Sequence, residues 1–238
     1  IALLSKENAI TFLAVVPLVF ILFFNKSFGK SLSIILPLIG AAVLFMIMRT
    51  AVLGFDLGST SMELMNNPFI KQVGDKYVSY SFGEKTATLF FIFLKYLGLL
   101  FFPHPLTHDY YPKQIEMMSF GDGSVLFSFL LFALMIFGSI YYYNRDRIIS
   151  FAILFFFFTF SIVSNVFVNI GTNMNERFLF MPSLGFCILI PYLIYKYSKS
   201  RNLTLGVVGI LIIAFSIKTI SRNNTWKDDF TLFTTDVK

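Results

Sequence analysis

Charge is scarce in this sequence. Only 13% of the 238 residues are Asp, Glu, Lys or Arg, whereas 56% are hydrophobic, and the mean hydropathy is +0.75. A soluble domain of this length needs far more polar surface. The apolar residues also come in long uninterrupted blocks, without the solvated faces of amphipathic helices. The composition therefore excludes a soluble globular protein and predicts one that lipid surrounds.

Cysteine and the motifs of common enzyme classes are also scarce or absent. The single cysteine, Cys187, can form no intrachain disulfide, and its apolar surroundings predict a packing role. The sequence contains no Walker, dinucleotide-binding, zinc-binding or serine-hydrolase motif. The first residue is Ile1 and not Met, and residues 1–5 resemble the end of a helix. We therefore expect an internal fragment of a longer protein.

What the sequence does contain is a series of apolar blocks, most of them long enough to cross a hydrocarbon core at about 1.5 Å per residue. The blocks are apolar on all sides, whereas the strands of a membrane barrel would be short and alternating, so they predict helices. The predicted fold class is all-α, a polytopic bundle of transmembrane helices. The blocks are Asn8–Phe24, Leu32–Met48, Thr86–Phe102, Ser124–Tyr143, Ile148–Val168, Phe178–Tyr197 and Leu203–Ile220.

The net charge of +6 could indicate nucleic acid or anionic lipid as a partner, so its position matters. Three short connections, 25–31, 144–147 and 196–201, hold seven basic residues and one acidic residue, and the remaining twelve of each sign cancel. A positive surplus confined to short interhelical loops orients those loops to the cytoplasm, so we expect no nucleic-acid partner. The basic residues are Lys26, Lys30, Arg145, Arg147, Lys196, Lys199 and Arg201, and the acidic one is Asp146.

This orientation leaves one block that should not cross the membrane. Loops 25–31 and 144–147 would both lie in the cytoplasm, so the three blocks between them cannot all cross. The exoplasmic side would hold loops 49–85 and 103–123, residues 169–177 and the tail 221–238. The block Thr86–Phe102, about 17 residues long, is among the shortest and carries Lys95 at its middle, where a charge costs about 2.5–3.5 kcal/mol. We predict a re-entrant or surface helix there and about six crossings elsewhere. The alternative is a full crossing with Lys95 paired or extended to the interface.

Polar residues near the exoplasmic side are the candidates for function. A polar or charged side chain in or near a membrane costs free energy, so it is expected mainly where it has a function. Lys6 and Glu7 lie at the mouth between two helices, where a lysine can bind phosphate as a point charge. The alternative is a helix boundary at which Lys6 and Glu7 pair with each other.

Arg177 stands at the predicted exoplasmic start of a helix. Its planar guanidinium could bind phosphate with two hydrogen bonds, and a cation there is unfavourable to the helix dipole, which favours a ligand role. The alternative is an interfacial anchor paired with Glu176.

The segment 103–111 holds both histidines of the chain, His104 and His108, together with Asp109 and Tyr110. These side chains could serve acid–base chemistry. A metal site is not indicated, since the prolines prevent a helix that would align the histidines and no third ligand is evident. The tyrosine could equally belong to an interfacial aromatic belt. In loop 49–85, Asp56 and Glu63 are weaker candidates for a base.

Several of these residues also carry a family resemblance. They are Leu3–Asn8 (LLSKEN), Phe102–Leu106 (FPHPL) with His108–Tyr110, Asn175–Cys187 (NERFLFMPSLGFC), and Ser221–Asn223 with Trp226. Together they resemble the membrane region of the transmembrane and tetratricopeptide-repeat O-mannosyltransferases and their bacterial relatives. The match spans nearly the whole chain, and residues 176–187 are its most specific element.

The resemblance implies a glycosyltransferase of the GT-C type. Such an enzyme takes a sugar from a polyprenyl- or dolichyl-phosphate donor and transfers it to an exoplasmic acceptor, here a protein. Residues 1–220 would be its membrane region, in a bacterial inner membrane or in the endoplasmic reticulum of a eukaryote. The tail from residue 221 would begin a tetratricopeptide-repeat domain that binds the acceptor. Lys6 and Arg177 would bind the donor phosphate, and the supporting cavity residues would be Glu7, Glu176, His104, His108, Asp109 and Tyr110.

The catalytic residue implied by the family falls outside this chain. The acidic pair of its first exoplasmic loop would lie before Ile1, so the catalytic base stays unknown and the isolated fragment is predicted to be inactive. Two other classes remain open. A transporter or flippase should place charges near the bilayer midplane on several helices, whereas only Lys95 does so here. A non-catalytic anchor for a repeat domain would need the helices alone.

Overall fold

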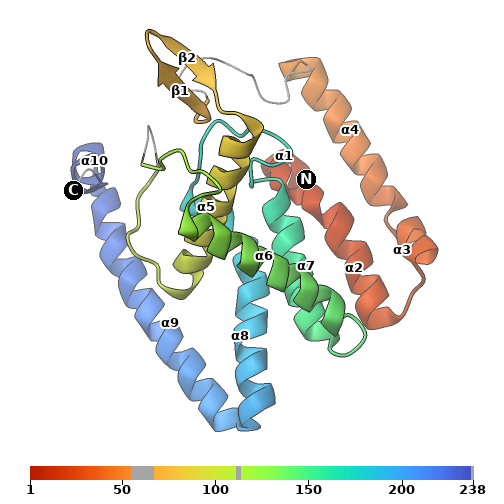
Figure 1. Cartoon of the computed structure of the whole chain (residues 1–238). Coiled ribbons are helices and arrows are strands. Elements are labelled where there is room, and N and C mark those ends of the chain that lie inside the picture. The colour runs from red at the N-terminus through yellow and green to blue at the C-terminus, as the bar shows by residue number, and fades with distance from the viewer. Residues whose placement is uncertain (55–66, 111–113, 237–238) are drawn as a thin grey trace.

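A computed structural model of the chain describes residues 1–54, 67–110 and 114–236, which form helices joined by short connections and one hairpin (Figure 1). The all-α class is confirmed. The elements are α1 (Ala2–Ser5), the 3-10 helix η1 (Glu7–Thr11), α2 (Phe12–Phe24), α3 (Phe28–Ile34), α4 (Leu36–Leu53), β1 (Ile70–Val73), β2 (Lys76–Ser79), α5 (Phe82–Phe101), α6 (Gly123–Tyr142), α7 (Arg147–Ser161), η2 (Glu176–Leu179), α8 (Ser183–Ser198), α9 (Arg201–Asn223), η3 (Asn224–Lys227) and α10 (Asp229–Asp236).

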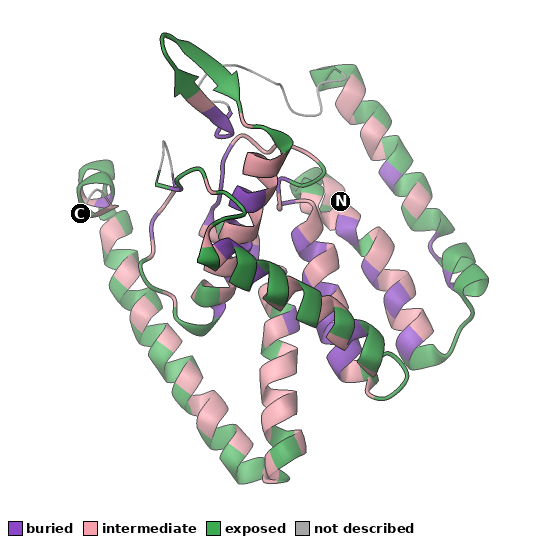
Figure 2. Cartoon of the chain, in the orientation of Figure 1, coloured by how far each residue is buried: buried purple, intermediate pink, exposed green. Residues whose placement is uncertain are grey.

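Within the described residues, four helical stretches are long and apolar enough to cross a membrane: Glu7–Phe24, Leu36–Leu53, Gly123–Tyr142 and Arg201–Lys227. Their side chains mostly face outward. None of the most apolar window of the last stretch is buried, and Figure 2 draws α9 in green and pink throughout. Apolar faces of this size are stable against lipid and not against water. The chain is therefore a multi-pass membrane protein.

The other two predicted crossings are shorter helices. α7 has 15 residues and α8 has 16, and α7 ends at Ser161 although the apolar block continues to Val168. Asn165 turns the chain with a left-handed φ of 57°, a conformation that asparagine tolerates well. Its amide nitrogen donates to the Thr172 carbonyl at 2.9 Å, and its amide oxygen accepts from the Ile170 backbone at the same distance. The hydrogen bonds of the Asn165 side chain thus hold residues 162–168 in a turn, although their hydropathy predicts that α7 continues to Val168.

The block Leu32–Met48 also differs from its prediction as a single helix. α3 and α4 meet at Ile35, whose φ of −89° and ψ of 0° are not helical. Pro37 lies in the first turn of α4, where a residue without a backbone N–H leaves no helical hydrogen bond unmade. The proline therefore begins a helix here and does not lie inside one.

α5, the helix predicted not to cross, lies at the centre of the molecule. Its buried side chains include Phe93 and Tyr96, which are 4% and 1% exposed. It carries Glu84, Lys85 and Lys95, and it is not among the four candidate spans. Its re-entrant path through the membrane stays a prediction.

The core around α5 is built from aromatic rings. The ring of Phe93 lies 5.4 Å from that of Phe132 on α6 and 6.0 Å from that of Phe160 on α7. The first pair is edge-to-face and the second is tilted, and aromatic pairs at such distances add to the energy of burial. Part of the high phenylalanine content of the sequence, 32 residues, therefore serves helix packing.

Residues 49–85 were predicted as one exoplasmic loop, and the described part of them is more regular than that. Arg49 belongs to α4, and β1 and β2 form an antiparallel hairpin with Val73 opposite Lys76. Gly74 begins the two-residue turn with a positive φ of 62°, which glycine adopts freely. An ion pair between Lys71 and Glu84 ties the hairpin to α5. Asp56 and Glu63 lie outside the described residues.

The three basic loops gather at one end of the bundle. Figure 1 shows the α2–α3, α6–α7 and α8–α9 connections at the lower end of the view, and the hairpin and both chain ends at the upper end. Asp146 joins two of the loops, since its carboxylate caps α7 and accepts from Lys196 Nζ at 2.6 Å. Arg147 Nη1 reaches the Leu22 carbonyl of α2 at 2.8 Å. The side of the membrane that each end faces stays a prediction.

Candidate functional site

A polar cavity lies at the end of the bundle opposite the basic loops. Its volume is about 620 Å³, and its walls come from η1, α4, residues 162–171 and Phe178 of η2. The polar side chains that line it are Glu7, Asn8, Arg49 and Asn169. Pockets of this size hold small-molecule ligands, which a few convergent polar groups orient.

Arg49 and Glu7 form the charged pair of this cavity. Arg49 Nε donates to Glu7 Oε1 at 2.9 Å, and the side chains are 18% and 56% exposed respectively. Arg49 Nη1 is buried and makes no hydrogen bond to any described residue. Because a buried donor without a partner costs about 1–3 kcal/mol, this nitrogen is suited to an oxygen of a bound molecule. The sequence left open an ion pair between Lys6 and Glu7. In the structure the Glu7 carboxylate binds Arg49 and not Lys6.

Lys6 lies beside the cavity without lining it. The residue is extended, with φ of −157° and ψ of 127°, and it joins α1 to η1. Its side chain is exposed and makes no ion pair with the described residues. Lys6 is thus an exposed cation one residue from Glu7, which lines the cavity.

Arg177 lies in η2 and not in the first turn of α8, where the sequence placed it. Asn175 caps η2 by accepting from the Arg177 backbone at 3.2 Å. The exposed guanidinium lies 5.5 Å from the ring centre of Phe178, and Phe178 lines the polar cavity. Arg177 therefore borders the cavity through its neighbour, and it does not form the predicted alternative ion pair with Glu176.

Glu176 holds the loop after α5. Its Oε1 accepts from the Thr107 backbone at 2.8 Å and from the Tyr110 hydroxyl at 3.2 Å. Burial raises the pKa of the Glu176 carboxyl, and these hydrogen bonds only partly oppose the rise. Burial likewise raises the pKa of Tyr110, and the nearby Glu176 charge adds to the rise. The two groups join η2 to residues 103–110.

His108 and Asp109 extend this network. His108 Nδ1 lies 2.9 Å from Asp236 Oδ2 in α10, and the His108 backbone donates to the same oxygen at 2.8 Å. Arg222 also pairs with Asp236, at 2.7 Å. Asp109 Oδ1 accepts from the Thr172 hydroxyl at 3.2 Å. The loop is thereby tied both to the cavity wall and to the C-terminal helices.

His104 takes no part in that network. Its Nδ1 lies 3.1 Å from Lys218 Nζ on α9, and the following peptide bond, to Pro105, is cis. The two histidines are thus held by different partners. In residues 1–54, 67–110 and 114–236 no three His, Cys, Asp or Glu side chains group as metal ligands would.

The structure therefore sorts the sequence candidates into two sets. Glu7 lines the polar cavity, with Lys6 and Arg177 beside it, whereas Glu176, His108, Asp109 and Tyr110 link the surrounding segments. Sequence reasoning did not select Arg49, Asp236 or Lys85. Arg49 could have been found, because it is a lone charge at the end of the apolar block Leu32–Met48.

The sequence of this chain is similar to those of several protein O-mannosyl-transferases. The protein O-mannosyl-transferase TMTC3 of the mouse is 31% identical over 148 residues, which are 59% of this chain and 16% of the relative. The protein O-mannosyl-transferase F38B6.6 of Caenorhabditis elegans is 26% identical over 190 residues, 78% of this chain and 26% of the relative. Human TMTC3 is 36% identical over 78 residues, 32% of this chain and 8% of the relative. This chain resembles the TMTC protein O-mannosyl-transferases.

The likeness covers a limited part of those proteins. The chain spans about a quarter or less of the length of these three relatives. No protein-family model and no solved structure matches it. The resemblance first indicated by residues 3–8, 102–110 and 175–187 is nevertheless confirmed at the level of sequence similarity.

Proposed function

We propose that this chain is part of an integral-membrane glycosyltransferase. It would move a sugar from a polyprenyl- or dolichyl-phosphate donor to a protein acceptor on the exoplasmic side. The observation that carries the proposal is the polar cavity at the end opposite the basic loops, which Arg49 lines while its Nε pairs with Glu7 at 2.9 Å. The names of the relatives, protein O-mannosyl-transferases, support mannose as the sugar and protein as the acceptor.

The residues around the cavity have separate roles in this proposal. Glu7 orients the Arg49 guanidinium through its Nε, which leaves Nη1 for an oxygen of the donor. Lys6 and Arg177 adjoin the lining residues Glu7 and Phe178, so both cations can neutralise a phosphate at the cavity mouth. The loop 103–110, held by Glu176, stabilises the segment that carries Arg177. The acceptor would bind through a repeat domain that follows α10.

Sugar transfer by the full-length protein tests the proposal. We expect Arg49→Ala, Lys6→Ala and Arg177→Ala each to lower transfer from polyprenyl-phosphate mannose to an acceptor peptide, by about tenfold or more for Arg49→Ala. Lys26→Ala, in a loop at the opposite end, is the matched control and should transfer at the wild-type rate. Undiminished transfer by all three variants would show that this cavity is not the donor site.

The same assay separates the two other classes. A membrane anchor for a repeat domain would bind acceptor protein and transfer no sugar even as wild type. A transporter would move the lipid-linked sugar across a vesicle bilayer without releasing the sugar from its lipid. Either result would replace the transferase assignment.

A further inference from the structure

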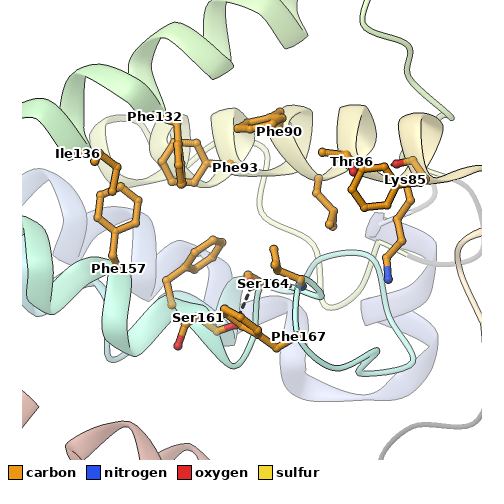
Figure 3. Close-up of a pocket in the computed structure, with 14 residues that line it drawn as sticks. Lys85, Thr86, Phe90, Phe93, Phe132, Ile136, Phe157, Ser161, Ser164 and Phe167 are labelled. Carbon is orange, nitrogen blue, oxygen red and sulfur yellow. Dashed lines mark hydrogen bonds between the residues drawn. The ribbon is translucent and has the colours of Figure 1, made fainter. Parts of the chain in front are cut away.

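A second cavity lies between α5, α6, α7 and the segment that follows α7. Its volume is about 500 Å³. Figure 3 shows Phe90 and Phe93 of α5, Phe132 of α6 and Phe157 of α7 around it, with Ser164 and Phe167 closing the lower side of the view. The cavity is distinct from the polar one, because residues 161–171 separate their linings.

Among the described residues, the lining in the body of this cavity presents no hydroxyl group that lacks a hydrogen-bond acceptor. Its three hydroxyl groups already donate to backbone carbonyls of their own segments: Thr86 to Phe82 at 2.7 Å, Ser161 to Phe158 at 2.7 Å and Ser164 to Ser161 at 2.6 Å. The remaining surface is aromatic and aliphatic. A hydrocarbon chain would therefore bind here without leaving a polar group unsatisfied.

Lys85 is the only charged residue that the described part of the chain contributes to this cavity. Figure 3 shows it at the end away from Ile136 and Phe157. Its Nζ donates to Asn169 Oδ1 at 2.7 Å and lies 5.2 Å from the centre of the Phe69 ring. It has no carboxylate partner among the described residues, so the positive charge at this end is not neutralised within that part of the chain.

Asn169 connects the two cavities. It accepts from Lys85, which lines the apolar cavity, and it is itself part of the lining of the polar one. An anionic group bound at Lys85 would therefore lie at the boundary between an apolar pocket and the pocket of Arg49 and Glu7. This arrangement matches a molecule that has a long apolar chain, a phosphate and a polar head group, in that order.

We propose that the α5–α6–α7 cavity binds the hydrocarbon chain of a polyprenyl phosphate and that Lys85 binds its phosphate. This proposal rests on the proposed function and assigns the donor's chain and an additional phosphate ligand to named residues. The single cavity of about 500 Å³ is in the range of pockets that hold one compact ligand, so it would take the part of one chain nearest the phosphate. One cation likewise matches one phosphate monoester or diester.

Lipid binding to the full-length protein in detergent micelles tests the proposal by native mass spectrometry. The probes are undecaprenyl phosphate, uncharged undecaprenol, phosphatidylglycerol and inorganic phosphate. Lys85→Gln removes the charge and keeps a side chain able to reach Asn169. Lys95→Gln is the matched control, because Lys95 belongs to the same helix, lies over the Phe91 ring and does not line the cavity. Ile136→Trp, compared with Ile136→Met, fills the far end of the cavity.

We expect undecaprenyl phosphate to bind wild type and Lys95→Gln equally, and to bind Lys85→Gln about tenfold more weakly. The affinity of wild type for undecaprenol should be as low as that of Lys85→Gln for undecaprenyl phosphate. Ile136→Trp should weaken the binding of both lipids. Four results would each overturn the proposal. They are phosphatidylglycerol binding as tightly as undecaprenyl phosphate or more tightly, Lys85-dependent binding of inorganic phosphate alone, equal effects of Lys85→Gln and Lys95→Gln, and no lipid binding. Near-UV circular dichroism would verify that each variant is folded.

Sugar transfer by the same variants separates this proposal from the proposed function. Wild-type transfer by Lys85→Gln with unchanged lipid binding would overturn the assignment of Lys85 and leave the transferase intact. Lys85-dependent lipid binding by a protein that transfers no sugar would overturn the transferase and leave the lipid site intact.

Discussion

Two partly buried carboxylates, Asp236 and Glu176, belong to the network around the loop 103–110, and they respond to pH in opposite directions. Burial tends to raise the pKa of Asp236, but hydrogen bonds from the His108 backbone, the His108 ring and Arg222 outweigh it, so the pKa is lowered. The stability that Asp236 contributes is therefore complete above its ordinary pKa of 3.8 and is lost as the pH falls through the lowered value. For Glu176, burial raises the pKa. Its contribution falls as the pH rises above the ordinary value of 4.5.

Asp236→Asn is expected to lower the free energy of unfolding by about 2 kcal/mol at pH 7, because four donors, the Thr107 hydroxyl among them, would lose a charged acceptor. It should also remove the acid-dependent part of that stability. Amide hydrogen exchange of α10 at pH 7 and at pH 3 measures both effects. Asp75→Asn, in the exposed hairpin turn, is the control. Unchanged protection of α10 in Asp236→Asn would show that the network does not hold the helix.

Residue types near the membrane surface could be selected from the sequence, but their partners could not. Lys6–Glu7 and Glu176–Arg177 are neighbours in the chain and were natural candidates for ion pairs. The structure pairs Glu7 with Arg49 at 2.9 Å and directs Glu176 to Thr107 and Tyr110. These partners are 42, 69 and 66 residues apart in the sequence, and no local pattern indicates contacts at that separation.

α7 and α8 approach each other closely at Gly185. A Cβ atom at this position would lie 2.5 Å from the Ala152 carbonyl oxygen and 3.2 Å from the Phe156 nitrogen. Both atoms belong to the α7 backbone, which cannot move as a flexible side chain would. Small residues allow close backbone approach between membrane helices. The glycine in the most specific part of the resemblance, residues 176–187, therefore has a packing reason.

Gly185→Ala is expected to destabilise the bundle by about 1–3 kcal/mol through overpacking. Thermal unfolding in detergent, followed by circular dichroism, measures the loss. Gly206→Ala in α9 is the matched control, since a Cβ there meets no atom within 4 Å, and it should be neutral or slightly stabilising. Equal melting temperatures for the two variants would contradict the close contact.

Hydropathy located the helices well where only lipid and other helices determine their length. The block Ser124–Tyr143 corresponds to α6 (Gly123–Tyr142), and the start of Asn8–Phe24 differs by one residue from the span Glu7–Phe24. It failed where one polar residue or proline redirects the chain, as Asn165 does after α7 and Pro37 does in the first turn of α4. The hairpin at 70–79 was missed because its strands have only four residues each.

For the molecule as a whole, the distribution of charge predicted an arrangement that the structure bears out in space. The loops that hold the positive surplus lie together at one end of the bundle, joined by Asp146 and Arg147. The cavity of Arg49 lies at the other end. If the positive-inside rule holds, the cavity opens on the exoplasmic side and α5 enters and leaves on that side.

Cysteine labelling tests the path of α5. In a Cys187→Ser background, Tyr77→Cys before α5 and Met117→Cys after it replace side chains that are 44% and 42% exposed. We expect a membrane-impermeant maleimide to label both from the exoplasmic side, and Lys26→Cys from the cytoplasmic side only. Labelling of Tyr77→Cys and Met117→Cys from opposite sides would show that α5 crosses fully.

We propose that a donor of the lipid-phosphate sugar class binds in the polar cavity, which Asn8 lines, and that this cavity opens on the exoplasmic side. Labelling of Asn8→Cys in the full-length Cys187→Ser protein, in membranes, with and without polyprenyl-phosphate mannose, tests both points. We expect labelling from the exoplasmic side alone, slowed by the donor and not by free mannose. Labelling from the cytoplasmic side, or a rate that the donor leaves unchanged, would contradict the proposal.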